Sequence, residues 1–237
     1  MDKVKLKTEL TYKLALETTK LVESKQSELK NIKWFDGEAN IDTEFSQLVC
    51  RCCELTWNKM KTNTEYEQVN IICNIPDVNI VFTLPNGEKV LSKIELKSSK
   101  KKIMPGSTIK KLEINQPLIY CLRPSTDLEL YKLKCSQYHS AMGESEYDLF
   151  QDRTPRPNIN FDKMDNNTYV SKDKDDWITH YSVSALNRIK NPEKYKSWQD
   201  TLTKDMKEKI INDYVKNTSQ EEFKLHKLKL EMNNINF

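Results

Sequence analysis

Residues 75–97 read IPDVNIVFTLPNGEKVLSKIELK, and this stretch decides the fold. The segments from Val78 to Phe82 and from Val90 to Lys97 are rich in β-branched and apolar residues, which predicts two strands. Pro85-Asn86-Gly87 lies between them and is a turn signal. The stretch therefore predicts a β-hairpin, with Asp77 directly before its first strand.

The loop of this hairpin sets which residues face one another. A three-residue loop combines a type I turn with a left-handed residue, and Pro85-Asn86-Gly87 suits those three positions in order. Such a loop pairs Leu84 with Glu88. Counting back along both strands, it also places Asp77 opposite Glu95.

The alternation of apolar residues supports this register. It pairs Val78 with Ile94 and Phe82 with Val90, so four apolar side chains share one face of the hairpin. A two-residue loop would slip the pairing by one residue and mix the two faces. The apolar pattern and the turn chemistry therefore predict the same register.

Asp77 and Glu95 would then lie on neighbouring strands, with backbones ~5 Å apart. Two carboxylates at this separation repel each other unless a cation joins them, and oxygen ligands favour Mg²⁺ or Mn²⁺. Lys97 shares a face with Glu95 and can hold or help deprotonate a metal-bound water. This group suits metal-assisted phosphodiester hydrolysis. The alternative is an exposed Glu95–Lys97 salt bridge, which is common, contributes little and leaves the matched register unexplained.

The pattern Pro76-Asp77…Glu95-Leu96-Lys97 resembles the motif of the PD-(D/E)xK nuclease superfamily, which includes many type II restriction endonucleases. The resemblance covers roughly residues 40–135. It implies an α/β fold with a restriction-endonuclease-like core, in which helices flank a mixed central β-sheet. It also implies a metal held by Asp77, Glu95 and the backbone carbonyl of Leu96.

In that superfamily, a helix before the motif often adds an acidic residue to the catalytic group. A helix is expected to begin near Asp42 or Thr43, either of which can cap it. Glu44 is the candidate third acid, with Glu54 as the alternative. Glu44 could equally serve only the helix dipole, because acids in a first turn stabilise a helix without any catalytic role.

Periodicity predicts the remaining elements of the chain. The expected elements are a polar helix over 3–32, a buried helix with apolar positions from Phe45 to Met60, strands near 71–73, 118–122 and 128–135, loops over 136–172, and helices near 176–190 and 200–216. We expect a single nuclease domain over 1–237, with a catalytic core at about 40–135. Residues 136–172 would add recognition loops, and residues 173–237 C-terminal helices.

Lysines and hydroxyl residues gather around the motif, as phosphate binding requires. The candidate DNA-binding residues are Lys93, Lys97, Lys100, Lys101, Lys102, Ser107, Thr108, Lys110 and Lys111. The alternative for any one lysine is an ordinary solvated loop.

Gln116 is a candidate cleft residue. Gln116 and Tyr120 match a QxxxY spacing that occurs in the recombination-type branch of the superfamily, although Pro117 argues against the helix of that branch. Arg153 and Arg156 are candidates for guanine contacts from the 136–172 loops.

Composition excludes several classes of protein. The 237 residues carry a net charge of +3 and contain no apolar run near the ~20 residues of a membrane span. The sequence begins without the apolar core of a secretory signal, so we expect a cytoplasmic protein whose six cysteines are reduced. Cys50 and Cys53 form a lone CxxC spacing, which we interpret as two buried core residues. No P-loop or GxGxxG motif is present, which argues against a nucleotide cofactor.

The sequence thus predicts a Mg²⁺-dependent endonuclease of type II restriction-enzyme type that cleaves double-stranded DNA at a specific site. Mn²⁺ is a possible substitute metal. The resemblance implies a homodimer, since a two-fold protein matches a palindromic site. The alternatives are a DNA-repair, recombination or RNA-processing nuclease of the same fold, and a non-catalytic nucleic-acid-binding module.

Overall fold

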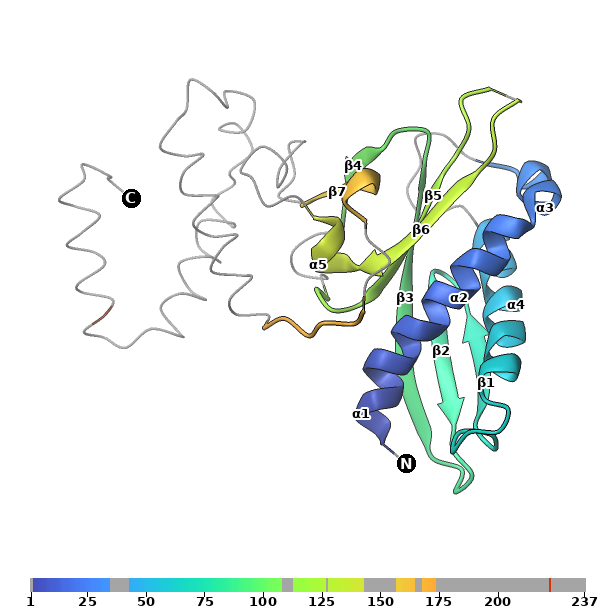
Figure 1. The fold of residues 1–237 in the computed structure, drawn as a ribbon, viewed down its shortest axis with the longest axis vertical. Helices are drawn as coiled ribbons and strands as arrows, with labels where there is room; N and C mark the ends of the chain where they lie inside the picture. The colour runs from blue at the N-terminus through green and yellow to red at the C-terminus, as the bar shows by residue number, and fades with distance from the viewer. Residues whose placement is uncertain are drawn as a thin grey trace.

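A mixed β-sheet forms the centre of the protein in its computed structural model (Figure 1), which describes residues 2–34, 43–107, 113–126, 128–142, 157–164, 168–173 and 222. Within these residues, the sheet has five strands in the order β1-β2-β3-β5-β6. Their bounds are Asn70–Asn74, Val78–Thr83, Lys89–Ser99, Pro117–Leu122 and Lys132–Gln137. Neighbouring strands are antiparallel except β3 and β5, which run parallel. The α/β class with a mixed central sheet is therefore confirmed.

The β2–β3 hairpin has the predicted register. Val78 pairs with Ile94 and Phe82 with Val90, and the N–H of Leu84 donates to the carbonyl of Glu88 over 2.8 Å. The loop is closed by Gly87, whose φ of +80° lies in the left-handed region that glycine adopts without a steric penalty. The three-residue loop is therefore confirmed.

The predicted N-terminal helix is present but divided into four parts. These are α1 Lys3–Lys5, the π-helical segment η1 Leu6–Leu10, α2 Thr11–Ser24 and α3 Gln26–Asn31. The break between α2 and α3 falls at Lys25, where φ is −92° and ψ is +48°. The next helix, α4 Thr43–Met60, begins at the predicted position.

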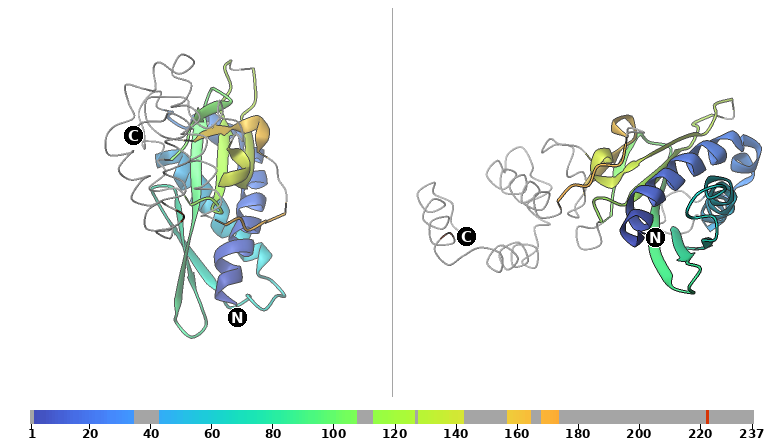
Figure 2. Two further views of the ribbon diagram at one scale, coloured as in Figure 1. Left: turned by 90° about the vertical axis from the view of Figure 1, so that its left-hand side faces the viewer. Right: turned by 60° about the horizontal axis from the view of Figure 1, so that its bottom comes forward.

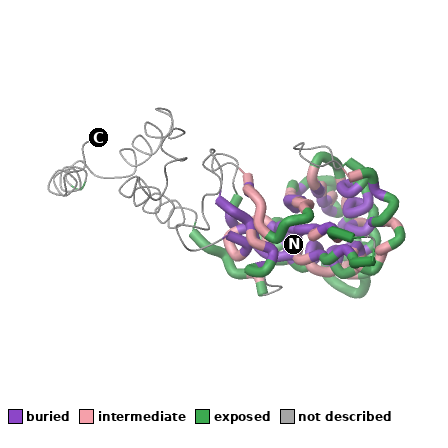
Figure 3. Tube along the Cα trace, turned by 90° about the horizontal axis from the view of Figure 1, so that it is seen from above, coloured by how far each residue is buried: buried purple, intermediate pink, exposed green. Residues whose placement is uncertain are grey.

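Helices α2 and α4 lie side by side on one face of the sheet (Figures 1 and 2). Every second residue of β2 is buried beneath them, as alternation along a strand requires. Trp57 of α4 meets Phe82 of β2 edge-on, with ring centroids 5.2 Å apart. Figure 3 shows the buried segments of sheet and helices in purple, and they form the main hydrophobic core.

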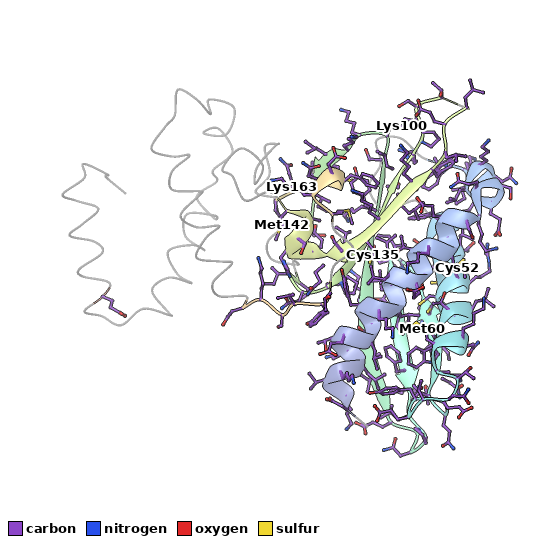
Figure 4. The ribbon with its side chains drawn as sticks, in the orientation of Figure 1. Cys52, Met60, Lys100, Cys135, Met142 and Lys163 are labelled. Carbon is purple, nitrogen blue, oxygen red and sulfur yellow. The ribbon has the colours of Figure 1, made fainter. Side chains whose placement is uncertain are left out.

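A second, smaller core lies on the opposite face of the sheet. Leu118 and Tyr120 of β5 pack there with Tyr138 of α5 Tyr138–Ala141 and with Phe161 of a short 3₁₀ turn, Phe161–Lys163. A two-stranded sheet, β4 Ile103–Pro105 with β7 Asn158–Asn160, adds to this layer. In Figure 4, Met142 and Lys163 lie on this side of the sheet.

Several sequence-based boundaries were wrong. The last strand of the central sheet begins at Lys132 and not at 128, because the side chain of Leu128 is 96% exposed and has no core to face. Leu55 is exposed on α4, although the pattern predicted burial. The described parts of 136–172 contain β7, α5 and the second core as well as loops. The predicted helices at 176–190 and 200–216 lie outside the described residues.

The cysteines and the helices bear on two further expectations. All six cysteines are free thiols, and Cys50 and Cys53 are buried, as the core interpretation of the CxxC spacing predicts. Within the described part of the chain, none of the helices combines the length and the apolar character that crossing a membrane would require.

We expect Phe82→Ala to lower the free energy of unfolding by about 3–5 kcal/mol, because it leaves a cavity beside Trp57. Urea unfolding followed by tryptophan fluorescence measures this. Leu91→Ala is the matched control in the same hairpin, since that side chain is 62% exposed and its truncation should cost less than about 0.5 kcal/mol. Equal losses in the two variants would contradict the observed hairpin faces.

Candidate functional site

Asp77 and Glu95 come together at the sheet face opposite α2 and α4. The observed strand pairing starts at Val78 and Ile94, so Asp77 lies one residue beyond it, in the turn between β1 and β2. Its φ of +54° is left-handed, a conformation that aspartate adopts more readily than most residues. In this position, one Asp77 oxygen, Oδ1, accepts a hydrogen bond from the N–H of Leu96 over 3.2 Å.

Glu95 is a buried carboxylate with several donors. Only 6% of the residue is exposed, yet Lys97 Nζ lies 2.5 Å from Oε1 and Lys93 Nζ lies 3.0 Å from Oε2. The hydroxyl of Ser107 also donates to Oε1 over 2.9 Å. Two ammonium groups and a hydroxyl thus compensate for the water that Glu95 loses on burial.

Lys93 joins the two acids. Its Nζ lies 3.0 Å from Asp77 Oδ2 and 3.0 Å from Glu95 Oε2. The repulsion expected between the two carboxylates is therefore relieved by a lysine of the same strand. Lys93, Glu95 and Lys97 share one face of β3 because they are spaced two residues apart.

These contacts shift the ionisation of Glu95. Burial is the largest single influence and raises its pKa, but the attraction of Lys97 and Lys93 together outweighs burial and holds the pKa below the ordinary value of about 4.5. Burial likewise lowers the pKa of Lys93, and the neighbouring Glu95 and Asp77 carboxylates raise it overall. Both groups are therefore charged at neutral pH.

Ser107 is held in place from the second core. Its backbone N–H donates to the Tyr138 hydroxyl over 2.5 Å, and burial raises the pKa of Tyr138 to about 12, so this hydroxyl stays protonated. The preceding Gly106 has no room for a side chain, because a Cβ there would lie 2.5 Å from the Tyr138 oxygen. Sequence reasoning proposed Ser107 as a phosphate contact and missed Tyr138, which no local pattern marks.

The residues present fit a hard divalent cation. An ammonium already lies within 3.0 Å of both carboxylates, so the space between them accommodates a positive group. The carbonyl of a strand residue points to the same side as its N–H, so the Leu96 carbonyl is directed toward Asp77. Carboxylate and carbonyl oxygens are ligands that Mg²⁺ and Mn²⁺ accept.

The predicted third acid does not join this group in the described residues. The Glu44 carboxylate accepts a hydrogen bond from the backbone N–H of Lys33 over 2.8 Å. The alternative, Glu54, accepts from the N–H of Cys73 on β1 over 3.1 Å. No cluster of three or more aspartate, glutamate, histidine or cysteine side chains suited to a metal occurs in the described ranges.

An open groove of about 410 Å³ lies beside Lys93, the lysine that contacts both carboxylates. Lys93 lines it together with Gln116, the predicted cleft residue. Among the residues that the structure describes, none accepts a hydrogen bond from the buried Nε2 of Gln116. The other lining residues are Lys7, Thr8, Asn79, Leu91, Ser92, Glu113, Asn115, Pro117 and Tyr169.

The remaining predicted DNA contacts fall into two groups. Lys100, Lys101 and Lys102 are exposed just beyond the end of β3, and Figure 4 shows Lys100 at that end of the sheet. Lys102 forms an exposed ion pair with Asp162 over 3.0 Å. Thr108, Lys110, Lys111, Arg153 and Arg156 lie outside the described residues.

Comparison with known proteins does not assign a family. No family model matches this chain, and none of the curated proteins matches it at a significant level.

The lowered Glu95 pKa predicts a pH-dependent contribution to stability. Glu95 binds a proton less readily in the folded protein than in the unfolded chain, so its stabilising contribution is present above pH about 4.5 and is lost as the pH falls through the folded pKa. Urea unfolding of the wild type and of Glu95→Gln between pH 3 and 6 measures this. The difference in unfolding free energy between them should shrink as the pH falls below about 4.5.

Glu88→Gln is the matched control for this measurement. Glu88 also pairs with a lysine, Lys3 over 2.6 Å, but on the surface. Solvent screens that pair, so its removal should change the pH dependence little. A Glu95→Gln profile parallel to that of the wild type over the whole pH range would contradict the lowered pKa.

Proposed function

We propose that the protein is a Mg²⁺-dependent endonuclease of type II restriction-enzyme type, which hydrolyses phosphodiester bonds of double-stranded DNA at a specific site. One observation carries the proposal: the acids Asp77 and Glu95 meet beside Lys97, and Lys93, which contacts both acids, lines an open groove. The mixed sheet flanked by helices agrees with a restriction-endonuclease-like core. The PD-(D/E)xK resemblance of these residues supports the same assignment.

Each residue of the group has a role in the proposed reaction. Asp77, Glu95 and the Leu96 carbonyl would hold the metal. When bound, a divalent cation supplies charge stabilisation to the scissile phosphate and lowers the pKa of a water. Lys97 is only 20% exposed at its side chain and lies 2.5 Å from Glu95, so it fixes that carboxylate and can donate a hydrogen bond to the attacking water.

Ser107 is a positioning residue in this scheme. It touches Glu95 and not the reacting atoms, and its own position depends on the Tyr138 hydroxyl. A carboxylate fixed by a lysine on one side and a serine on the other has few rotamers left. Such preorganisation lowers the reorganisation needed when the reaction begins.

Duplex DNA is the proposed substrate because a row of lysines extends from the acids, along the end of β3 and into the segment just beyond it. Lys97 lies on β3, and Lys100, Lys101 and Lys102 are exposed just beyond its end at Ser99. B-form DNA presents a phosphate charge every ~1.7 Å of its axis, so a duplex lying along the row can make several contacts. As part of the same proposal, the protein acts as a homodimer in a compartment that keeps its thiols reduced.

The proposal is tested by plasmid digestion with and without Mg²⁺. We expect discrete fragments from the wild type with Mg²⁺, and a loss of at least about a hundredfold in rate for Asp77→Ala. Glu88→Gln is the control, since it removes a lysine-paired acid at the far end of the hairpin and should cleave normally.

Other outcomes of the digestion select the alternatives. A smear in place of fragments would indicate a non-specific or repair nuclease. Cleavage of RNA substrates alone would indicate RNA processing. DNA binding without any cleavage would overturn the enzyme proposal and leave a nucleic-acid-binding module.

A second prediction concerns the lysine row. Lys101→Ala should weaken DNA binding for all sequences and reduce the slope of log affinity against log salt by about 0.9, the value for one phosphate contact. Fluorescence anisotropy with Ca²⁺ in place of Mg²⁺ measures binding. Lys13→Ala is the control, because Lys13 is exposed on α2, on the other side of the sheet. An unchanged slope for Lys101→Ala would exclude this lysine from the interface.

A further inference from the structure

Lys93 occupies the position that the proposed metal requires. Its ammonium is equidistant from Asp77 Oδ2 and Glu95 Oε2, at 3.0 Å from each. Mg²⁺ binds carboxylate oxygens at ~2.0–2.1 Å, so an ion held by both acids would need the same two oxygens that now contact the ammonium. Two cations so close repel each other strongly, so Lys93 and the metal exclude one another from this position.

The two lysines of the group are placed differently. Lys97 contacts the other carboxylate oxygen of Glu95, Oε1, and forms no ion pair with Asp77 in the described structure. The Lys93 side chain is 40% exposed and lines the open groove, so it has a solvated space to enter when it leaves the acids. Lys97 can therefore stay with Glu95 while Lys93 moves.

We propose that Lys93 is a tethered counter-ion that holds Asp77 and Glu95 together without a metal and swings into the groove when a divalent cation binds. This inference rests on the proposed metal-dependent function. In the metal-free protein, Lys93 relieves the repulsion between the two carboxylates and keeps them near the geometry that a cation needs. The same contact lowers the apparent affinity for metal, because binding must first displace the lysine.

Substitution of Lys93 separates these effects. Lys93→Met keeps the length of the side chain and removes its charge, so it should bind Mn²⁺ about tenfold more tightly than the wild type. Lys93→Arg keeps a competing cation and should stay within about threefold of the wild type. Lys7→Met is the matched control, since Lys7 lines the same groove but makes no contact with either acid in the described structure.

The binding is measured on the full chain with Mn²⁺ alone, from the electron paramagnetic resonance signal of the free ion. Asp77→Asn identifies the site, because its loss of a carboxylate should abolish the tight binding. Circular dichroism checks that each variant is folded before titration.

A second measurement needs no substitution at the lysine. Brief acylation of the wild type with an amine-reactive ester, followed by peptide mass spectrometry, reports how accessible each lysine is. The labelling of Lys93 should rise severalfold when saturating Mn²⁺ is added, while the labelling of Lys7 stays constant. Asp77→Asn should show no metal-dependent rise.

The outcomes distinguish this inference from the proposed function. Equal Mn²⁺ affinity in the wild type and Lys93→Met, lost in Asp77→Asn, would overturn the counter-ion role and leave the metal site standing. Absence of Mn²⁺ binding in both the wild type and Lys93→Met would overturn the metal site and the inference together. Tighter binding by Lys93→Met with metal-dependent labelling of Lys93 supports both.

Discussion

The pairing of Leu84 with Glu88 across the Pro85-Asn86-Gly87 loop is the constraint on which the site depends. Strand alternation has a period of two, so a slip of one residue would send every side chain of β3 to the other face. With the observed register, Ile94 and Leu96 enter the main core while Glu95 faces the second layer. The position of Asp77 beside Glu95 depends on the same register, because Asp77 is the turn residue directly before the Val78–Ile94 pair.

The burial of Glu95 explains why two lysines and a serine surround its carboxylate. A charged carboxylate removed from water is costly unless cations and hydrogen-bond donors replace the solvent. Lys97 and Lys93 provide the charge, and Ser107 provides a donor. Ser107 in turn is positioned by Tyr138, which is itself buried in the second core. The small layer of β4, β7 and α5 therefore serves the site as well as covering the sheet.

Features encoded within a short stretch of sequence were predictable. The hairpin register follows from local turn chemistry, and α4 begins at Thr43, close to the residues that the sequence offered as caps. The pairing of Ile103 with Asn160 joins segments far apart in the chain, and local patterns carry no information about it. Leu55 fits the apolar spacing of α4 but lies at the exposed edge of the helix, which periodicity alone does not resolve.

The candidate site was predictable in part, and Lys93 is the instructive residue. Its spacing of two from Glu95 placed it on the same face of the strand as that acid. The sequence alone equally allowed a second role, as one of the seven lysines predicted to bind DNA phosphates. The left-handed backbone conformation of Asp77 distinguishes these roles, because the turn after β1 places the Asp77 carboxylate 3.0 Å from the Lys93 ammonium.

Charge explains why the role of Lys93 matters for a nucleic-acid substrate. The two acids and the two lysines sum to zero, so the group by itself offers little attraction to a phosphate. If a divalent cation replaces Lys93 between the carboxylates while Lys93 stays in the adjoining groove, the local charge rises from zero to +2. The displaced ammonium would then be available to an anionic backbone lying in that groove. On the proposed mechanism, metal binding and DNA binding each favour the other, because thermodynamic linkage requires the coupling to be the same in both directions.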